Sequence, residues 1–470
     1  MRKTKIVCTI GPASNNEHVL EEMCKRGMNV ARLNFSHGTH ADHLNNINLI
    51  KSVRERLGLP IAILLDTKGP EYRTGVLEGG SVNIEEGQRF TFTTRDIIGN
   101  NETVSVSYKN LPSELCVKDI ILVNNGLLVF EVAEISGEDI ICTAITGGEL
   151  SDRKSMSFPG RVMHQEYLSE QDKDDLLFGI EQGIDFIACS FVSKKQDVLD
   201  VKNFVREHTG EQIGIIAKIE NRSGIENIEE ICEACDGIMV ARGDLGVEVP
   251  FEELPHIQKT LITRCRMLGK RVITATEMLE SMIHNPRPTR AEISDVANAV
   301  YDGTSAVMLS GETAAGKYPA KTVETMARII EKTEESISYE KRFRDFDFKI
   351  KNSMDAISHS VCGMSIDLHA KAIVVCSLSG MTARMVSRFR SPVDIIGLSV
   401  NERTWRQLAL SWGVMPVMCE VYPSQEVLFY TAEKLAKRVL GLSEGDKIII
   451  TGGSTDGKSG TTNTIRFATI

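Results

Sequence analysis

The sequence predicts an α/β fold in three parts: an eight-stranded (β/α)8 TIM barrel, an inserted β-barrel lid domain and a C-terminal α/β domain. The chain of 470 residues is long enough for two or three domains with their own cores. Short apolar runs alternate with helical patterns up to about residue 338, with one interruption, and the alternation resumes near the C-terminus. The predicted domains are 1–70 with 162–338 for the barrel, 71–161 for the lid and 339–470 for the C-terminal domain.

The barrel prediction rests on eight β-rich apolar runs and on the polar residues at their ends. The runs are residues 5–10, 29–34, 61–66, 185–191, 214–220, 237–241, 271–276 and 306–310. Strands that alternate with helices imply a parallel sheet, and eight repeats fit a closed barrel with its active site at the carboxyl ends of the strands. Polar residues interrupt the runs almost only at those ends: Arg32, Asn34, Asp66, Ser190, Lys218, Glu220, Thr276 and Ser310.

Between the third and fourth runs the apolar pattern changes to period two, which predicts antiparallel strands. The alternating segments are 90–93, 104–107, 120–123, 128–132 and 140–144. Gly69-Pro70 and Pro159-Gly160 bound this region and are natural hinge sequences. A module inserted after the third barrel strand hangs over the active-site end, so we expect it to act as a lid.

The last part of the chain predicts a separate α/β domain with a mostly parallel sheet. A helical pattern at 320–336 is followed by a charged stretch, 339–345, which we interpret as a linker. Predicted strands follow at 372–376, 394–399, 415–419 and 447–451, with helices at 381–389, 404–410 and 426–439. Residues 461–468 are predicted to add an edge strand.

Composition indicates a soluble, cytoplasmic protein with no nucleic-acid and no membrane partner. The formal net charge of −10 gives no support to a polyanionic partner, and no apolar run approaches the length of a membrane span. Most of the eleven cysteines lie in apolar runs, which indicates free thiols in a reducing compartment. The isolated CxxC of Cys232 and Cys235 is interpreted as helix packing, and His40 and His43 as surface residues of a helix.

Three charged residues mark the ends of two neighbouring strands. Positions two apart in a strand point the same way, so Lys218 and Glu220 share one face, and the next run ends just before Asp244. Magnesium takes oxygen ligands, often one or two carboxylates together with substrate phosphates. A lysine beside them supplies positive charge for a phosphoryl group in transfer. A salt-bridged rim is the simpler alternative.

Residues 452–459 match the P-loop pattern, but their context does not. A P-loop must open a helix, whereas the residues that follow, 460–467, favour a strand. We therefore predict no nucleotide hydrolysis at this loop. A loop rich in glycine and hydroxyl groups can still bind phosphate through backbone N–H groups, and a flexible surface hairpin is an equal alternative.

Seven motifs, in order along the whole chain, resemble those of the pyruvate kinase family. They are TIGP at 9–12, ARLNFSHG at 31–38, LDTKGPE at 65–71, KIE at 218–220, MVARGDLG at 239–246, ATEMLESM at 275–282 and NPRPTRAE at 285–292. The three-part layout is also the one that this family has. The resemblance implies an enzyme of glycolysis that moves the phosphoryl group of phosphoenolpyruvate to ADP and yields pyruvate and ATP.

The resemblance implies roles for individual residues. Lys218 resembles the lysine that stabilises the phosphoryl group, Glu220 and Asp244 resemble ligands of Mg²⁺ (or Mn²⁺), and Thr276 resembles the hydroxyl that assists protonation of the enolate. Further substrate contacts are implied for Arg32, Arg73, Ser190, Ala241, Arg242 and Gly243, and nucleotide contacts for Asn34, His37, Arg73 and Lys154. Asn34, Ser36, Asp66 and Thr67 resemble a K⁺ cage, and Glu71 resembles the acid of potassium-dependent members.

The family resemblance also implies a homotetramer and a phosphorylated allosteric effector. Ser377, Ser379, Gly380 and Thr382 lie in a predicted strand-to-helix turn, where backbone N–H groups and the helix dipole favour anions. The loop 454–462 is expected to close over the same phosphate. Met381 stands where a basic or polar residue is expected, so a monophosphorylated effector is at least as well supported as a bisphosphate.

Two other functions are compatible with parts of the sequence. A magnesium-dependent carbon–carbon lyase acting on a pyruvate enolate would not need the lid lysine or the potassium cage. A catalytically silent sugar-phosphate sensor would not need Lys218 and Glu220. The segments 155–157 and 124–126 depart from the family pattern at the lid and at the approach of the nucleotide, and Ser193 departs from it after the fourth barrel strand.

Overall fold

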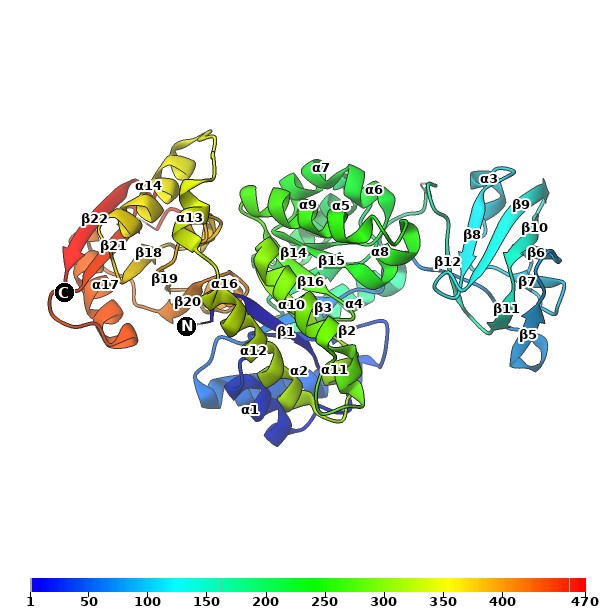
Figure 1. Ribbon diagram of the computed structural model, residues 1–470, viewed down its shortest axis with the longest axis horizontal. Coiled ribbons are helices and arrows are strands. Elements are labelled where there is room, and N and C mark those ends of the chain that lie inside the picture. The colour runs from blue at the N-terminus through cyan, green and yellow to red at the C-terminus, as the bar shows by residue number, and fades with distance from the viewer. Residues whose placement is uncertain (1, 162, 456) are drawn as a thin grey trace.

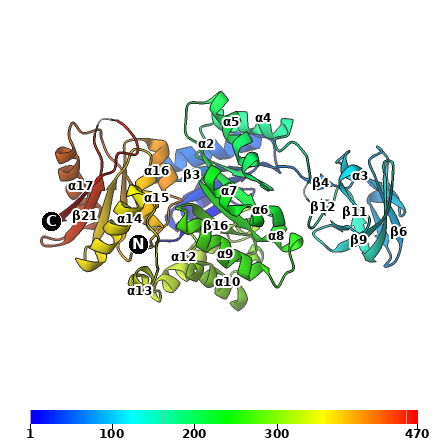
Figure 2. The same cartoon turned by 90° about the horizontal axis from the view of Figure 1, so that it is seen from above.

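The computed structural model describes residues 2–161, 163–455 and 457–470, arranged as three units along the long axis of the molecule (Figure 1). The barrel lies in the centre, with the inserted β domain at one end and the C-terminal domain at the other. The view from above shows the same order (Figure 2). The predicted α/β class with a closed eight-stranded barrel is confirmed. The domain boundaries stay predictions, and the one placed at position 162 lies outside the described residues.

Eight parallel strands close the barrel in the order β1-β17-β16-β15-β14-β13-β3-β2. They are β1 (Lys5–Thr9), β2 (Val30–Asn34), β3 (Ala62–Asp66), β13 (Phe186–Cys189), β14 (Gly214–Ile219), β15 (Gly237–Ala241), β16 (Arg271–Ala275) and β17 (Ala306–Leu309). Several strands end slightly before the predicted runs because the chain turns there. Phe191 and Thr276 have φ values of 55° and 71°, which a strand cannot continue through.

Helices alternate with these strands and cover the outside of the barrel (Figure 1). They are α1 (Glu17–Lys25), α2 (His40–Leu57), α4 (Glu170–Glu181), α5 (Lys195–His208), α6 (Arg222–Glu226), α7 (Ile228–Ala234), α8 (Arg242–Glu248), α9 (Leu254–Met267), α10 (Arg290–Asp302), α11 (Gly311–Ala314) and α12 (Pro319–Glu335), with a 3-10 turn at Glu280–Ile283. Capping boxes start α2, α4 and α10. One apolar layer fills the barrel and a second lies between strands and helices, as in other barrels of this class.

The inserted domain is a β structure between β3 and β13. Its elements are β4 (Tyr72–Arg73), a 3-10 turn at Glu78–Gly80, β5 (Ser81–Ile84), β6 (Arg89–Thr93), β7 (Thr103–Ser105), α3 (Leu111–Glu114), β8 (Ile120–Val123), β9 (Leu128–Ser136), β10 (Asp139–Thr146), β11 (Gly148–Ser151) and β12 (Ser155–Ser157). The strands form a seven-stranded sheet, β4-β12-β8-β9-β10-β6-β7, and a two-stranded sheet, β11-β5, around buried Phe90, Phe92 and Phe130. The pair β6–β7 is parallel, so the prediction of a purely antiparallel module is wrong at this edge.

The C-terminal domain has the predicted sheet, in the order β20-β19-β18-β21-β22. Its strands are β18 (Ala372–Cys376), β19 (Asp394–Ser399), β20 (Val414–Met418), β21 (Lys447–Gly452) and β22 (Thr464–Thr469), and its helices are α14 (Ser353–Asp367), α15 (Met381–Ser387), α16 (Glu402–Leu408) and α17 (Gln425–Leu440). β22 is the antiparallel edge strand. The described residues between β21 and β22 form no helix, which confirms that this loop is not a P-loop; position 456 lies outside them.

Two local predictions are wrong. His43 is buried rather than on the surface, because its ring stacks on Phe35 at a centroid distance of 3.9 Å and its Nε2 lies 2.9 Å from the carbonyl oxygen of His37. The expected linker contains the helix α13 (Tyr339–Arg344). Tyr339 and Phe343 lie one turn apart on it and are both buried, so packing orders this charged stretch.

The C-terminal domain packs against the amino ends of the barrel strands. The Nζ of Lys5, at the start of β1, donates to the carbonyl oxygen of Val414 over 2.7 Å. A guanidinium nitrogen of Arg271, at the start of β16, donates to the carbonyl oxygen of Gln407 over 3.1 Å. Leu410 belongs to the apolar cluster that fills the barrel. The carboxyl ends of the strands are therefore left to face the inserted domain.

Candidate active site

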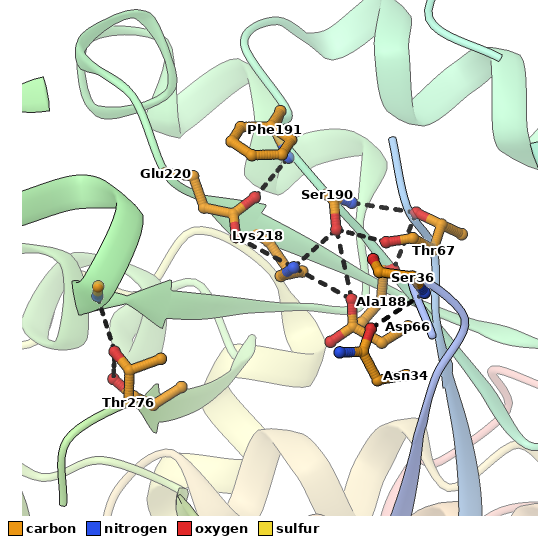
Figure 3. Close-up of polar contacts among 12 residues, drawn as sticks. Asn34, Ser36, Asp66, Thr67, Ala188, Ser190, Phe191, Lys218, Glu220 and Thr276 are labelled. Atoms are coloured by element: carbon orange, nitrogen blue, oxygen red, sulfur yellow. Dashed lines mark hydrogen bonds and ion pairs between the residues drawn. The ribbon is translucent and has the colours of Figure 1, made fainter. Parts of the chain in front are cut away.

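Lys218 is the centre of a buried charged cluster at the carboxyl ends of β3, β13 and β14 (Figure 3). Its Nζ lies 3.1 Å from Asp66 Oδ1 and 3.0 Å from Glu220 Oε1, and it donates to Ser190 Oγ over 2.6 Å. Burial alone would lower the pKa of Lys218, but Asp66 and Glu220 together raise it above its ordinary value. The ammonium group therefore stays charged although it is buried.

Glu220 follows β14 directly and lies on the same side of the chain as Lys218, as the period of a strand requires. One oxygen contacts Lys218, and Oε2 accepts a 2.6 Å hydrogen bond from the backbone N–H of Phe191. Burial raises the pKa of Glu220 to about 7, and Asp244 raises it further against the effect of Lys218. A carboxylate in this setting is stabilised by an added cation.

Asp244 approaches Glu220 from the first turn of α8, the short helix that follows β15. Both carboxylates line a cavity of about 140 Å³ between the barrel mouth and the inserted domain. Among the described residues there is no cluster of three or more histidine, cysteine or carboxylate side chains that could enclose a metal. Two carboxylates at an open cavity fit Mg²⁺ or Mn²⁺, because such an ion also takes substrate oxygens as ligands.

Thr276 lies apart from the charged cluster, at the end of β16 (Figure 3). Its Oγ1 accepts a 2.7 Å hydrogen bond from the backbone N–H of Gly243 and donates to the carbonyl oxygen of Ala275 over 2.6 Å. Arg242 holds the same turn: its guanidinium donates to the carbonyl oxygen of Thr276 over 2.5 Å and pairs with Asp295 at 2.7 Å. The side chain of Arg242 thus supports the turn instead of reaching into the cavity, and Ala241 ends β15 beside it.

The four residues of the predicted potassium cage come together beside Lys218 (Figure 3). The backbone N–H of Ser36 donates to Asn34 Oδ1 over 3.2 Å, and Asn34 pairs with Asp66 in the β2–β3 register. Thr67 Oγ1 accepts from the backbone N–H of Ser190 over 3.2 Å. As possible ligands of a cation, these residues offer oxygen atoms and include a single carboxylate. Such a set of hard ligands with low total charge fits a monovalent cation such as K⁺.

Arg32 reaches this cluster from β2 and is buried within it. Its Nε lies 2.6 Å from Asp66 Oδ2 and one terminal nitrogen donates to Thr9 Oγ1 over 2.9 Å. Asp66 is therefore bound by two cations, Arg32 and Lys218, and they lower its pKa although burial acts to raise it. His37 lies exposed in the loop after β2.

The predicted contacts from the inserted domain are less direct. Arg73 pairs with Glu71 at 3.0 Å and donates to the carbonyl oxygen of Arg153, while the backbone N–H of Lys154 donates to Thr74 Oγ1 over 2.9 Å. Their neighbours Tyr72 and Ser155 line the cavity between the domains, but Arg73 and Lys154 do not. The structure brings these two residues to the edge of the site only.

One residue of this cavity was missed by sequence reasoning. Glu248 lies one helical turn beyond Asp244 on α8, and burial raises its pKa to about 7. A hydrogen bond with Ser157 of the inserted domain acts in the opposite direction on that pKa. The i, i+4 spacing from Asp244 was the available signal, because such residues share a helix face.

A second cavity, of about 170 Å³, lies in the C-terminal domain, and of the predicted effector residues Ser377 lines it. Gly380 precedes α15 with φ of 70°, Thr382 Oγ1 lies 2.8 Å from Thr462 Oγ1, and Ser459 Oγ donates to Ser379 Oγ over 2.9 Å. Ser379, Gly380 and Thr382 do not line the cavity themselves, but Ser459 and Thr462, which contact Ser379 and Thr382, do. The loop 454–462 thus folds over the start of α15, although its position 456 lies outside the described residues.

No helix in the described part of the chain is long and apolar enough to cross a membrane.

Comparison with known proteins gives matches along the whole chain. Residues 1–323 match the family model "Pyruvate kinase, barrel domain" and residues 355–468 match "Pyruvate kinase, alpha/beta domain". The chain is 47% identical to the pyruvate kinase of Staphylococcus saprophyticus and 46% identical to that of Staphylococcus aureus strain MRSA252, over 99% of this chain and 80% of each relative. The crystal structure of a pyruvate kinase from Cryptosporidium parvum superposes with a TM-score of 0.94 at 38% identity, over 100% of this chain and 96% of the other.

Proposed function

The chain belongs to the pyruvate kinase family, a family of glycolytic phosphotransferases that act on phosphoenolpyruvate and ADP, and on that premise we propose how its own residues carry out the transfer. An oxygen of the ADP β-phosphate attacks the phosphorus of phosphoenolpyruvate, and the bond from phosphorus to the enol oxygen breaks. ATP and the enolate of pyruvate result, and a proton then adds to the enolate carbon. The protein has to position these groups and neutralise charge rather than form a covalent bond.

Lys218 carries the central role in this proposal. Its buried ammonium group lies among Asp66, Ser190 and Glu220, so its position is fixed before the substrate binds. A preorganised cation in a water-poor site stabilises the charge on a phosphoryl group in transfer more than a mobile one does. This charged cluster is the single observation that supports the function best.

Glu220 and Asp244 would hold the divalent cation, Mg²⁺ or Mn²⁺. When bound, such an ion neutralises charge on the substrate's phosphoryl oxygens. The support from this chain is the raised pKa of Glu220 and the shared cavity of the two carboxylates. Glu220 is held for this task by the backbone N–H of Phe191, whose left-handed φ turns that N–H toward the carboxylate.

Thr276 is proposed to hold the proton path to the enolate carbon. Gly243 and Ala275 fix its hydroxyl oxygen, and Arg242 fixes the turn on which it lies. Arg242 is therefore proposed as a positioning residue, while Ala241 and Gly243 offer backbone groups to the substrate. Arg32 and Ser190 complete the substrate side of the site.

Asn34, Ser36, Asp66 and Thr67 are proposed to hold K⁺, whose charge when bound would add to that of Lys218 and Arg32. The nucleotide would contact Asn34 and His37 from the barrel. Arg73 and Lys154 would reach it from the inserted domain, which requires that domain to move toward the barrel mouth, since neither residue lines the cavity as it stands. Hinges at 69–70 and 159–160 would allow this movement.

Allosteric control and assembly are proposed from the family. The turn at Ser377, Ser379, Gly380 and Thr382, beside the cavity that Ser377 lines, would take a phosphorylated effector under the loop 454–462. A homotetramer would couple this site to the barrel by a shift between two states, and the glycolytic role supports a cytoplasmic location. Neither a carbon–carbon lyase nor a silent sensor is favoured by any feature of the site.

The experiment that tests the proposed site compares Lys218→Met with Lys332→Met, which changes an exposed lysine of α12. Pyruvate formation from phosphoenolpyruvate and ADP is followed in a coupled assay. We expect kcat of Lys218→Met to fall by roughly two to three orders of magnitude, with Mn²⁺ affinity retained and Lys332→Met unchanged. Wild-type turnover in Lys218→Met would refute the assignment.

A further inference from the structure

A cavity of about 330 Å³ lies between the barrel and the C-terminal domain, and the proposed function makes no use of it. Residues at the ends of α9 and α10 line its barrel side, and residues of α13, of the segment after it, of α14 and just after α15 line the other. It shares no lining residue with the active-site cavity or with the effector cavity. Its volume is within the range of small-molecule sites.

Four arginines line this cavity, and three of them have no carboxylate partner. Arg388 pairs with Asp355 at 2.6 Å, but Arg266, Arg342 and Arg390 form no ion pair in the described part of the chain. The side chain of Arg266 also makes no hydrogen bond in the described residues. The Nε atoms of Arg266, Arg388 and Arg390 are buried without a partner, and Arg388 and Arg390 are only 5% and 4% exposed. Buried donors of this kind are rarely left unpaired.

The arginines also repel one another. Burial lowers the pKa of Arg266 to about 10, and the neighbouring Arg342 lowers it further. Burial lowers the pKa of Arg390 as well, with Arg266 as the next cause. Like charges gathered in a poorly solvated place cost free energy unless an anion joins them. The charge of these arginines therefore favours an anionic ligand in the cavity.

Two carboxylates at the cavity do not offset this charge. Asp302 is bound by Lys259 and accepts a 3.2 Å hydrogen bond from Gln258. Asp345 lies exposed at the rim. A net positive charge therefore faces the interior.

The rest of the wall is aromatic. The rings of Phe348 and Phe389 meet edge to face at 4.8 Å, and His359 lies 5.2 Å from Phe389. The guanidinium of Arg388 lies 4.6 Å from the ring centre of Phe348. Edges and faces of this kind pack well against a further planar ring. A ligand that pairs with the arginines and also packs against the aromatic rings would carry an anionic group and a ring.

We propose that this cavity is a second effector site, which binds a small phosphorylated ligand with a planar ring, of the class of aryl phosphates and mononucleotides. Its phosphate would contact Arg266 and Arg342, because guanidinium groups donate paired hydrogen bonds to phosphate oxygens. Arg390 would contribute its unpaired Nε, since its terminal nitrogens already donate to Ser387 and Gly303. Its ring would lie against Phe348 and Phe389. The site goes beyond the proposed function and is distinct from the loop at 454–462.

A chain of hydrogen bonds leads from this cavity to the active site. Asp302, in the wall, accepts from Gln258 Nε2 over 3.2 Å, and Gln258 Oε1 accepts from Arg242 over 3.4 Å. Arg242 in turn holds the Thr276 turn. A ligand that displaces Asp302 would displace Gln258 and Arg242 in turn, and with them the turn at Thr276. We therefore expect binding to change the phosphoenolpyruvate concentration that gives half-maximal rate.

The test uses calorimetric titration of the full-length enzyme with phosphoenolpyruvate and Mg²⁺ present to fill the active site. The probes are phenyl phosphate and AMP, which carry a ring, and inorganic phosphate, which does not. Arg266→Gln removes a guanidinium group that makes no ion pair or side-chain hydrogen bond in the described residues, so the change breaks no existing contact of that kind. Arg328→Gln, on the exposed face of α12, is the matched control. We expect at least one ring-bearing probe to bind at least about tenfold more tightly than phosphate, and Arg266→Gln to weaken it about tenfold.

Two further readouts distinguish ligand binding in this cavity from a purely structural role of Arg266 and from binding at the effector loop. Arg266→Gln should leave the Tm of the unliganded enzyme unchanged or raised, because it relieves repulsion, whereas loss of a structural arginine would lower it. Thr382→Glu should leave binding intact. The proposal fails if neither ring-bearing probe binds, if phosphate binds as tightly, if Arg266→Gln binds like Arg328→Gln, or if Thr382→Glu abolishes binding. None of these outcomes bears on phosphoryl transfer itself.

Discussion

The guanidinium of Arg242 donates a 2.5 Å hydrogen bond to the carbonyl oxygen of Thr276. The contact joins the first residue of α8 to the turn after β16, and Asp295 of α10 anchors the arginine from behind at 2.7 Å. Thr276 has φ of 71°, an unfavourable backbone conformation for a β-branched residue. Arg242 therefore holds a strained turn that the proposed proton transfer depends on.

We expect Arg242→Lys to lower kcat by about ten- to a hundredfold, because a small displacement of a reacting group is enough for such a loss. The single nitrogen of a lysine cannot replace the three separate guanidinium nitrogens that contact Ala275, Thr276 and Asp295. Asp295→Asn, which keeps the shape of the anchor, should cause a smaller loss in kcat. Steady-state kinetics measures both, and unchanged kcat in Arg242→Lys would show that the turn holds itself.

Activity should require a monovalent cation, with K⁺ the most effective. Replacing K⁺ by tetramethylammonium should lower the rate by at least about tenfold, since one positioned charge is lost. Glu71→Lys should reduce this dependence because its ammonium group can supply the charge, although it breaks the 3.0 Å pair with Arg73. Glu149→Lys, on an exposed part of β11, is the control. Equal rates in both salts would contradict the cage.

The effector loop gives a third prediction. Several sugar phosphates and AMP are titrated against phosphoenolpyruvate saturation curves, and at least one should shift the wild-type curve. Thr382→Glu should abolish that shift, because its carboxylate would lie beside Thr462, 2.8 Å from the present hydroxyl. Ser379→Asp, at a less buried position, adds the same kind of charge and gives an independent test if Thr382→Glu does not fold. A response that survives both changes would place the effector elsewhere.

Lys5 should make the enzyme's stability depend on pH above neutrality. Burial lowers its pKa to about 7, with Arg2 as the next cause, whereas an unfolded lysine titrates near 10.4. Between these values the unfolded state holds a proton that the folded state has released, so stability rises with pH, by up to about 1.4 kcal/mol per pH unit from this group.

Lys5→Met should remove this slope. Relative to wild type, the variant should be most stable near pH 7 and lose that advantage toward pH 10, apart from a constant cost for the hydrogen bond to Val414. Urea unfolding at pH 7, 8 and 9 measures the difference, with the exposed Lys332→Met as control. Parallel curves for Lys5→Met and wild type would mean that Lys5 keeps an ordinary pKa.

The barrel could be predicted because each strand carries its own signal: a short apolar run with a polar end. What the sequence could not show was where a strand stops for tertiary reasons, as at Phe191 and Thr276, where contacts of the site stabilise positive φ. The parallel pairing of β6 with β7, which sets Thr91 opposite Thr103, has no signature in the period-two pattern of either strand. The helix α13 was missed because its charged residues concealed the spacing of Tyr339 and Phe343.

The site could be predicted in part for the same reason. Lys218 and Glu220 share a strand face by local geometry alone, and the structure brings them within 3.0 Å. Arg32 and Asp66 lie on the neighbouring strands β2 and β3, so their pairing depends on the register between these strands, which the sequence does not show. The place of Glu248 in the site could not be predicted, because it depends on the inserted domain burying one face of α8. Roles for Arg73 and Lys154 depend on the relative position of two domains, which no local pattern contains.

The inserted domain has a consequence for how such a chain could be built or rebuilt. β3 pairs directly with β13 in the barrel, so the ring closes without any contribution from the inserted residues between them. At the other side, β4 pairs with β12, so the insertion ties its own two ends together. The module is thus a loop extension that folds back on its own stem. A short turn from 69 to 163 should leave a barrel that still folds, and the module alone should be transplantable to the same strand connection of another barrel.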